Sequence, residues 1–309
     1  MNNKIMCPWG YGKRHEFVDT PCCEEKINAL ESEIANLESQ VQDAKLDGAT
    51  EVSTPNVNTP NSNVKVTSEI AADTKVVAKS VFMDGASINA KMDVTASENI
   101  ECVNSKVGGS YPGSTVIMNL KDAEKVVFKD MVFDAADSYN TINIGLAANK
   151  QAKEVVFEDC MFLGPIRNNA ISVYGTQENA VVTVKNCVFE NVSNPFRMCN
   201  NANVSNVVVN IKNCEIKSWD ANPDYAGLVI CQDYTSATEE ECISNDLFNK
   251  NKLTINVENT IGPNGKNMID YVKEFGIQNT VVYVWQSKSK VQLINAEEHP
   301  EFYPTVNVK

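Results

Sequence analysis

The sequence predicts an all-β protein whose main body is a parallel β-helix, preceded by a short N-terminal anchor and a coiled coil. Three observations predict the β-helix. One eight-residue pattern occurs five times, its Asp or Asn positions recur at a regular spacing, and its apolar residues alternate as they do in strands. The five segments are Val126–Phe133, Val155–Phe162, Val182–Phe189, Val209–Ile216 and Ile255–Gly262.

Aligned in register, the five segments have a consistent residue type in each column. The first column is Val or Ile, whereas the fourth is Lys or Glu and must face water. The fifth column is Asp or Asn, which tolerate left-handed backbone and form local hydrogen bonds at a bend. We call this column the Asx ladder, and it consists of Asp130, Asp159, Asn186, Asn213 and Asn259.

The spacing of the Asx ladder indicates a solenoid. Its members lie 29, 27, 27 and 46 residues apart, and in a solenoid each repeat buries its apolar face only by stacking on its neighbours. A second short strand recurs within the repeats, so each coil holds a strand, the bend, a short strand, a loop, a strand and a loop. These second strands are Ile142–Ile144, Ile171–Val173, Phe196–Met198 and Leu228–Ile230.

The sixth column holds small or soft side chains just after the bend. It contains Cys160, Cys187 and Cys214, which should point into the coil, where a free Cys behaves as a small hydrophobic residue. Adjacent rungs are about 4.8 Å apart, but three cysteines in a row cannot all pair. We expect reduced, packed thiols.

The Asx residues at a tight bend, with an inward ladder of like side chains beside them, resemble the right-handed β-helix of the pectate-lyase-like superfamily. The resemblance covers about residues 94–262 and concerns architecture. That superfamily includes lyases, hydrolases, phage tailspikes and structural fibres, so the resemblance implies the fold without implying one activity.

Composition excludes some partners. The net charge of −13 and the pI near 4.7 argue against nucleic acid, because phosphate binding needs clustered Lys and Arg. The sequence lacks a run of eighteen apolar residues and the apolar stretch of a signal peptide. We therefore expect a soluble protein with no membrane insertion.

Residues 1–23 are expected to form an anchor. The segment is too short for a core, yet it contains Trp9, Tyr11 and Phe17, residue types that are common in interface hot spots. Two interpretations stay open: a structural zinc ion that holds the segment together, or a docking arm without metal that orders on its partner. The candidate zinc ligands are Cys7, His15, Cys22 and Cys23.

Residues 24–46 have the pattern of a coiled-coil oligomerisation helix. Apolar residues recur at spacings of three and four, with Ile or Val at position a and Leu or Ala at position d. This arrangement favours a dimer. A seam of about 27 Å is short, so the number of helices in the coiled coil can be set by the symmetry of the domains that it joins. We call these residues the seam: Ile27, Leu30, Ile34, Leu37, Val41 and Ala44.

The rest of the chain is divided by composition. Residues 47–65 are rich in Asn, Ser, Thr and Pro and are expected to be a flexible linker. Residues 66–262 form the β-helix, and residues 263–309 form C-terminal strands and a cap. Within this last part, Met268–Phe275 has helical spacing and precedes Gly276, a typical helix stop.

The sequence predicts no catalysis. It lacks the Asn-Thr-Asp, Gly-His-Gly and Arg-Ile-Lys motifs of polygalacturonase-like solenoids, and its only histidines, His15 and His299, lie outside residues 66–262. Arg197 is expected to face outward, where it would contact an anionic sugar. Several carboxylates on one loop side would suit an acid/base pair, although a solvated acidic surface explains them as well. They are Asp134, Asp137, Glu190, Asp220 and Asp224.

The order of anchor, coiled coil, linker and β-helix resembles a bacteriophage head fibre or capsid decoration protein. The resemblance implies a structural projection at the virion surface, assembled in the host cytoplasm and attached to a capsid protein through its N-terminus. It implies a homotrimer, whereas the seam favours a dimer, and it leaves contact with cell-surface glycans open. The alternatives are a tailspike-like polysaccharide depolymerase and a non-catalytic glycan-binding adhesin.

Overall fold

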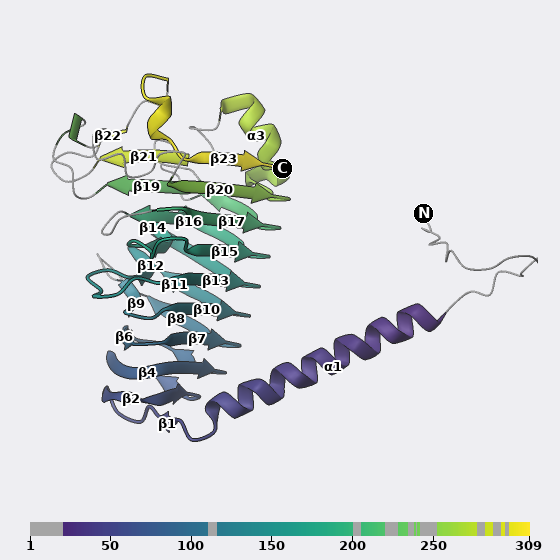
Figure 1. Ribbon diagram of the computed structural model, residues 1–309, viewed down its shortest axis with the longest axis vertical. Coiled ribbons are helices and arrows are strands. Elements are labelled where there is room, and N and C mark those ends of the chain that lie inside the picture. Colours follow the sequence, from purple (N-terminus) through teal and green to yellow (C-terminus); the bar gives the residue numbers. More distant parts are fainter. Residues whose placement is uncertain are drawn as a thin grey trace, which may run out of the picture. The chain divides into compact units, whose positions relative to one another are not determined.

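The computed structural model divides the chain into two compact units, Met1–Asp47 and Gly48–Lys309, and each is described here by itself. In the first unit the described part is one helix, and the second unit is built mainly of strands (Figure 1). The structure describes residues 21–110, 116–199, 205–219, 228–233, 238, 240–241, 252–276, 282–286, 292–293 and 297–309.

Helix α1 (Pro21–Leu46) is 26 residues long, which corresponds to about 39 Å. Proline is well suited to its first position, because the nitrogen there has no intrahelical partner. The helix is followed by Gly48, whose φ of 71° lies in the left-handed region that glycine adopts without strain. The predicted helix at residues 24–46 is therefore confirmed.

The second unit has three parallel sheets, which we name A, B and C in the order in which each coil visits them. Strands β2, β4, β14 and β16 are long and contribute to two sheets each. Sheet A contains β1 (Thr50–Glu51), the ends of β2 (Asn56–Val66) and β4 (Thr74–Asp84), β7 (Asn99–Val103), β10 (Lys125–Lys129), β13 (Glu154–Glu158), β15 (Val181–Lys185), β17 (Val207–Lys212), β20 (Leu253–Glu258) and β23 (Thr305–Val308).

Sheets B and C follow sheet A in each coil. Sheet B contains β3 (Glu69–Ile70), β5 (Ser87–Ile88), β8 (Lys106–Ser110), β11 (Val132–Ala136), the beginnings of β14 (Met161–Val173) and β16 (Val188–Cys199), and β18 (Glu215–Trp219). Sheet C contains the beginnings of β2 and β4, β6 (Met92–Ala96), β9 (Val116–Lys121), β12 (Asn140–Ile144), the ends of β14 and β16, β19 (Val229–Asp233) and β21 (Val282–Gln286).

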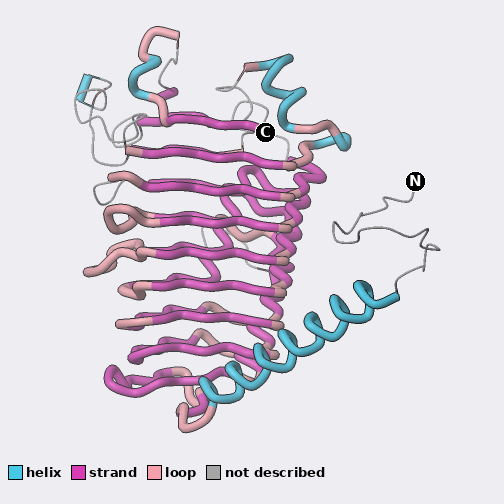
Figure 2. Tube along the Cα trace, turned by 45° about the vertical axis from the view of Figure 1, so that its right-hand side comes forward, coloured by secondary structure: helices cyan, strands magenta, loops and turns pink. Residues whose placement is uncertain are grey.

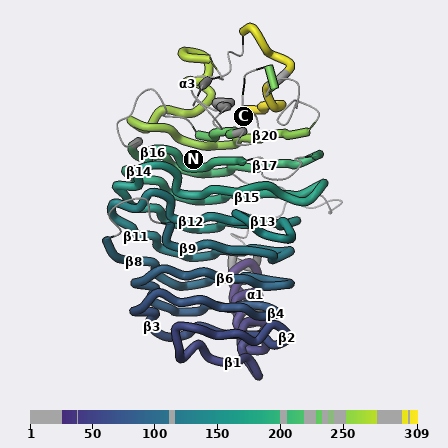
Figure 3. Tube along the Cα trace, turned by 90° about the vertical axis from the view of Figure 1, so that its left-hand side faces the viewer, coloured from purple at the N-terminus to yellow at the C-terminus, as the bar shows by residue number. Residues whose placement is uncertain are grey.

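These pairings make the second unit a parallel β-helix-like solenoid, as the repeats predict. Each strand pairs in parallel with the equivalent strand of the next coil, for example β10 with β13 and β13 with β15. Figure 2 shows the coils stacked one above another. In Figure 3 the chain advances from β1 and β2 at one end to β20 near the other.

The core of the solenoid is a continuous stack of inward side chains. Phe128 stacks on Phe157 at a ring-centroid distance of 4.8 Å, and Phe162 stacks on Phe133 and Phe189 at 4.6 and 4.9 Å. All five rings are buried. Each coil therefore completes the core of its neighbours, which is the physical basis of the repeat.

The prediction of a flexible linker at residues 47–65 is wrong. Strand β2 pairs in parallel with β4, and Val64 and Val66 are fully buried. The polar composition is compatible with a strand because main-chain hydrogen bonds to β4 do not depend on side chains. A register shift between Thr59 and Asn63 accommodates Pro60, which cannot donate a backbone hydrogen bond. The solenoid unit consequently begins at Gly48 rather than at residue 66.

The C-terminal residues belong to the same unit rather than to a separate part. Helix α3 (Met268–Phe275) has the predicted bounds, and the side chain of Asn267 accepts a hydrogen bond from the Ile269 amide at its N-terminus. Strand β23 pairs in parallel with β20, and β22 (Gln292–Leu293) pairs antiparallel with β21. Two short 3-10 helices complete the described elements: η1 (Pro263–Gly265) and η3 (Pro300–Phe302).

Candidate functional site

The seam of α1 is the most exposed group of large apolar side chains in the described part of the chain. Its five Ile, Leu and Val side chains are between 52% and 58% exposed, and Ala44 is exposed too. Half-exposed apolar side chains repeated along one stripe of a helix are typical of a surface that packs against a partner. The exposed residues are Ile27, Leu30, Ile34, Leu37 and Val41.

The Asx ladder has the left-handed backbone that the sequence predicts. The φ values of its five members lie between 47° and 55°. Their side chains also hydrogen-bond from coil to coil: Asn186 donates to Asp159 at 2.9 Å, and Asn213 donates to Asn186 at 3.2 Å. Asn104 extends the ladder by one coil, with a φ of 48° and a hydrogen bond to Asp84. The ladder fixes the bend between sheets A and B.

The cysteine column lies inside the solenoid as expected. Cys160, Cys187 and Cys214 are free and buried, and each thiol donates to the carbonyl two residues earlier at 3.2 to 3.3 Å. Hydrogen bonding with Cys160 is the main cause that raises the pKa of Cys187, and burial adds to it. Hydrogen bonding with Cys187, followed by burial, raises the pKa of Cys214. Protonated, enclosed thiols are poor nucleophiles and metal ligands.

Outward charges of sheet A pair along the solenoid axis. Lys125 contacts Glu154 at 2.9 Å, Lys185 contacts Glu158 at 2.6 Å, and Lys212 contacts Glu258 at 3.4 Å. The hydrogen bond to Glu158 raises the pKa of Lys185. Exposed ion pairs contribute little to stability, so their main effect is to favour one register between coils.

Sheet C has a column of outward side chains that are buried, which the sequence does not predict. Asn143, Ser172 and Arg197 are in register and face outward, yet Arg197 is only 3% exposed. Its guanidinium donates to Gln232 at 3.1 Å and to the Tyr174 hydroxyl at 2.5 Å. Arg197 therefore faces outward as predicted, but it is covered rather than accessible. Strand alternation gives the direction of a side chain but contains no signal for what covers it.

Arg197 and Tyr174 form a compact polar contact on sheet C. The guanidinium carbon lies 5.1 Å from the centroid of the Tyr174 ring, within the range of a cation–π interaction. Burial raises the pKa of Tyr174 to about 12, and the positive charge of Arg197 offsets part of this effect. The hydroxyl therefore stays protonated at neutral pH.

Among the described candidate carboxylates, Asp134 and Glu190 lie in one outward column of sheet B, two coils apart, with Leu163 between them. Asp134 contacts Lys106 at 3.5 Å, and Glu190 contacts Lys217 at 3.8 Å. At Asp137 the described contacts involve the backbone carbonyl, which accepts two hydrogen bonds from Arg167. The other two candidates, Asp220 and Asp224, lie outside the described residues.

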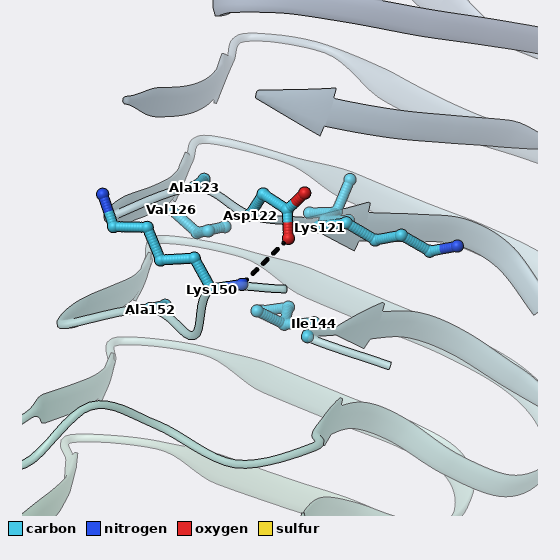
Figure 4. A pocket seen from close by; sticks show the side chains of 9 residues that line it. Lys121, Asp122, Ala123, Val126, Ile144, Lys150 and Ala152 are labelled. Carbon is cyan, nitrogen blue, oxygen red and sulfur yellow. Dashed lines mark hydrogen bonds between the residues drawn. The ribbon is translucent and has the colours of Figure 1, made fainter. Parts of the chain in front are cut away.

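A small depression lies between the coils that contain β9 and β12 (Figure 4). It has no room for a water molecule, and Ala123, Val126 and Ile144 contribute apolar lining. Asp122 accepts hydrogen bonds from the backbone nitrogens of Asn149 and Lys150. The carboxylate thus holds the neighbouring loop in place.

The anchor residues Trp9, Tyr11 and Phe17 lie outside the described residues, as do Cys7 and His15. Cys22 and Cys23 belong to the first turn of α1. The zinc site stays a prediction. Within the described ranges, no three His, Cys, Asp or Glu side chains are placed to hold a metal ion, and none of the described helices is long and apolar enough to cross a membrane.

Comparison with known protein families, curated proteins and solved structures finds no match for this chain. Inference about its function therefore depends on the chain's own sequence and geometry.

Proposed function

We propose that this protein is a homo-oligomeric structural projection in which α1 joins the copies and the solenoid is the displayed body. The seam of α1 carries the proposal. Its apolar side chains are more than half exposed, and a parallel coiled coil buries such side chains at positions a and d. Burying the exposed half of five such side chains contributes on the order of 5 kcal/mol per chain before the entropy cost of association.

The solenoid suits a structural role because its outward side chains interact mainly with one another. The Asx ladder and the lysine–glutamate pairs connect successive coils, and the phenylalanine stack fills the interior. Such a body is stiff along its axis, because every coil is hydrogen-bonded to the next. We take the winding as right-handed, the hand of nearly all parallel crossover connections.

The order of N-terminal anchor, helix α1 and solenoid favours a bacteriophage head fibre or capsid decoration protein over the other projections considered. In this proposal residues 1–23 dock on a capsid protein through Trp9, Tyr11 and Phe17, and the solenoid faces outward from the virion. The coiled coil multiplies one weak contact by the number of chains, so that a short arm holds a large body. We favour three copies, the usual number in such fibres, although Ile at a with Leu at d suits two.

Light scattering on the full chain at micromolar concentration tests the assembly. We expect an oligomer, and Ile34→Asp should weaken association at least tenfold, because it places charges in a buried layer. Ser39→Asp is the control, since Ser39 is exposed and lies at position f, opposite the seam. A monomeric wild-type chain would refute the proposal.

A chain without residues 1–23 should stay oligomeric and no longer join the virus particle.

A further inference from the structure

The outward surfaces of the three sheets differ in ways that bear on assembly. Sheet C already buries the outward side chains Asn143, Ser172 and Arg197. Sheet B has register shifts where β14 pairs with β16 and where β16 pairs with β18. From β7 to β23, sheet A pairs without a register shift. Sheet A therefore offers the most regular outward surface of the described solenoid.

The outward surface of sheet A from β7 to β23, which we call the A-face, is rich in β-branched and amide side chains. All of these side chains are at least partly exposed, and Val181 is 40% exposed. Short, stiff side chains on a regular sheet make a flat surface that loses little entropy on contact. The β-branched and amide side chains of the A-face are Val127, Val156, Val181, Thr183, Val208, Asn210, Thr254 and Asn256.

The A-face is electrically balanced although the chain is strongly acidic. It carries four lysines and four glutamates, whereas the net charge of the whole chain is −13. Two copies can therefore bring their A-faces together without the repulsion that other acidic surfaces would cause. The charged residues are Lys125, Lys129, Lys185, Lys212, Glu101, Glu154, Glu158 and Glu258.

The connection between α1 and the solenoid is short. The helix ends at Leu46 and the first strand begins at Thr50, so the three intervening residues let these ends separate by at most about 14 Å. Packed helices lie about 8–10 Å apart. The solenoids of neighbouring copies joined through α1 therefore begin within about 40 Å of one another.

We propose that the A-face packs against a second copy of this chain, facing the axis of the oligomer. The inference depends on the proposed self-association of α1 and specifies how the displayed bodies are arranged. It makes the projection a closed bundle of solenoids rather than a set of independent arms.

The size of the A-face sets the conditions under which it packs. Seven strands about 4.8 Å apart and about 17 Å long cover roughly 500 Å², whereas stable interfaces bury about 800 Å² on each partner. The A-face alone is therefore too small to hold two copies together. It packs once α1 has raised the effective concentration of neighbouring solenoids.

The test compares two matched variants of the full chain. Val181→Asp changes the A-face, and Met161→Asp changes sheet B; the two residues are 40% and 38% exposed, and each begins its strand. Light scattering gives the mass and small-angle X-ray scattering gives the radius of gyration. We expect Val181→Asp to raise the radius of gyration at unchanged mass, and Met161→Asp to leave both at wild-type values.

A second A-face variant, Thr183→Asp, should behave as Val181→Asp does, and circular dichroism checks that each variant is folded. If both A-face variants keep the wild-type radius of gyration in an intact oligomer, the A-face inference is wrong and the proposed function stands. An equal rise in Met161→Asp would also overturn it. A monomeric wild-type chain overturns the inference together with the proposed function.

Discussion

Ile34 in α1 and Ile255 in β20 are the same residue type in opposite environments. Ile34 is 55% exposed, whereas Ile255 is 0% exposed. The solenoid buries its isoleucines because each coil supplies a neighbour for the next one. Helix α1 has an equally regular apolar pattern, but within the described part of its own unit nothing packs against it.

This comparison shows that one kind of sequence regularity can serve two levels of assembly. In the solenoid, apolar side chains repeat about every 27 residues and pack against the next repeat of the same chain, so folding completes the core. In α1, apolar side chains at spacings of three and four residues need another helix to pack against, so folding of one chain leaves the seam exposed. Stability of the first unit should therefore depend on protein concentration, and stability of the second should not.

Matched isoleucine truncations test this difference and should give the largest effect. Ile255→Ala should lower the free energy of unfolding of the solenoid by about 2–5 kcal/mol at every protein concentration, because it leaves a cavity in a packed core. Ile34→Ala should leave the unfolding of the solenoid unchanged and shift the oligomer to higher concentrations. Chemical denaturation followed by circular dichroism at two protein concentrations, with light scattering, separates these outcomes.

The opposite pattern would contradict the comparison. If Ile34→Ala lowered the stability of the solenoid as much as Ile255→Ala at both concentrations, α1 would be part of the same cooperative core.

A second prediction concerns the Asx ladder, which gives the solenoid its bends. Asn186 has a φ of 54° and bonds with Asp159 and Asn213. Asn186→Leu should destabilise the solenoid by about 1–2 kcal/mol, because leucine resists left-handed backbone. Met161→Leu, at an exposed outward position of sheet B, is the control and should stay within about 0.5 kcal/mol. Equal midpoints of denaturation for the two variants would mean that the bend does not require Asn186.

The sequence predicts the solenoid well because its strongest constraints are local and repeated. The bend residues, the inward cysteine column and the bounds of α3 follow from residue type and spacing alone. The composition of residues 47–65 predicts a linker because strand β2 is held by backbone hydrogen bonds to β4, which leave little trace in side-chain composition. The first residues of β2, Asn56–Thr59, pair with β4, and β1 pairs with β2 only at Val64 and Lys65.

The burial of Arg197 could not be predicted for a different reason. Strand alternation places it outward, and its cover comes from other parts of the fold. In sheet C the chain covers its own outward side chains, in contrast to the seam of α1.

The last and smallest effect tests this internal cover through the pH dependence of stability. Tyr174 has a pKa of about 12 in the folded protein, raised by burial from an ordinary value of 10.0. As the pH rises through this interval, the unfolded chain loses the tyrosine proton before the folded chain does, so stability falls. Below pH of about 10 the contribution is complete. Between about pH 9 and pH 11 the folded protein should lose about 1 kcal/mol through this group.

Tyr174→Phe is the matched variant, because it keeps the ring and removes the ionising hydroxyl. The variant is expected to be less stable at pH 9, since Arg197 loses a hydrogen-bond partner. Between about pH 9 and pH 11, however, the loss of stability of the variant should be about 1 kcal/mol smaller than the loss of the wild type. The titration of groups other than Tyr174 is common to both proteins and cancels in the difference. If the two proteins lost the same stability over this range, the hydroxyl would titrate like an exposed tyrosine, and the outward side of sheet C would be as open to water as the seam of α1.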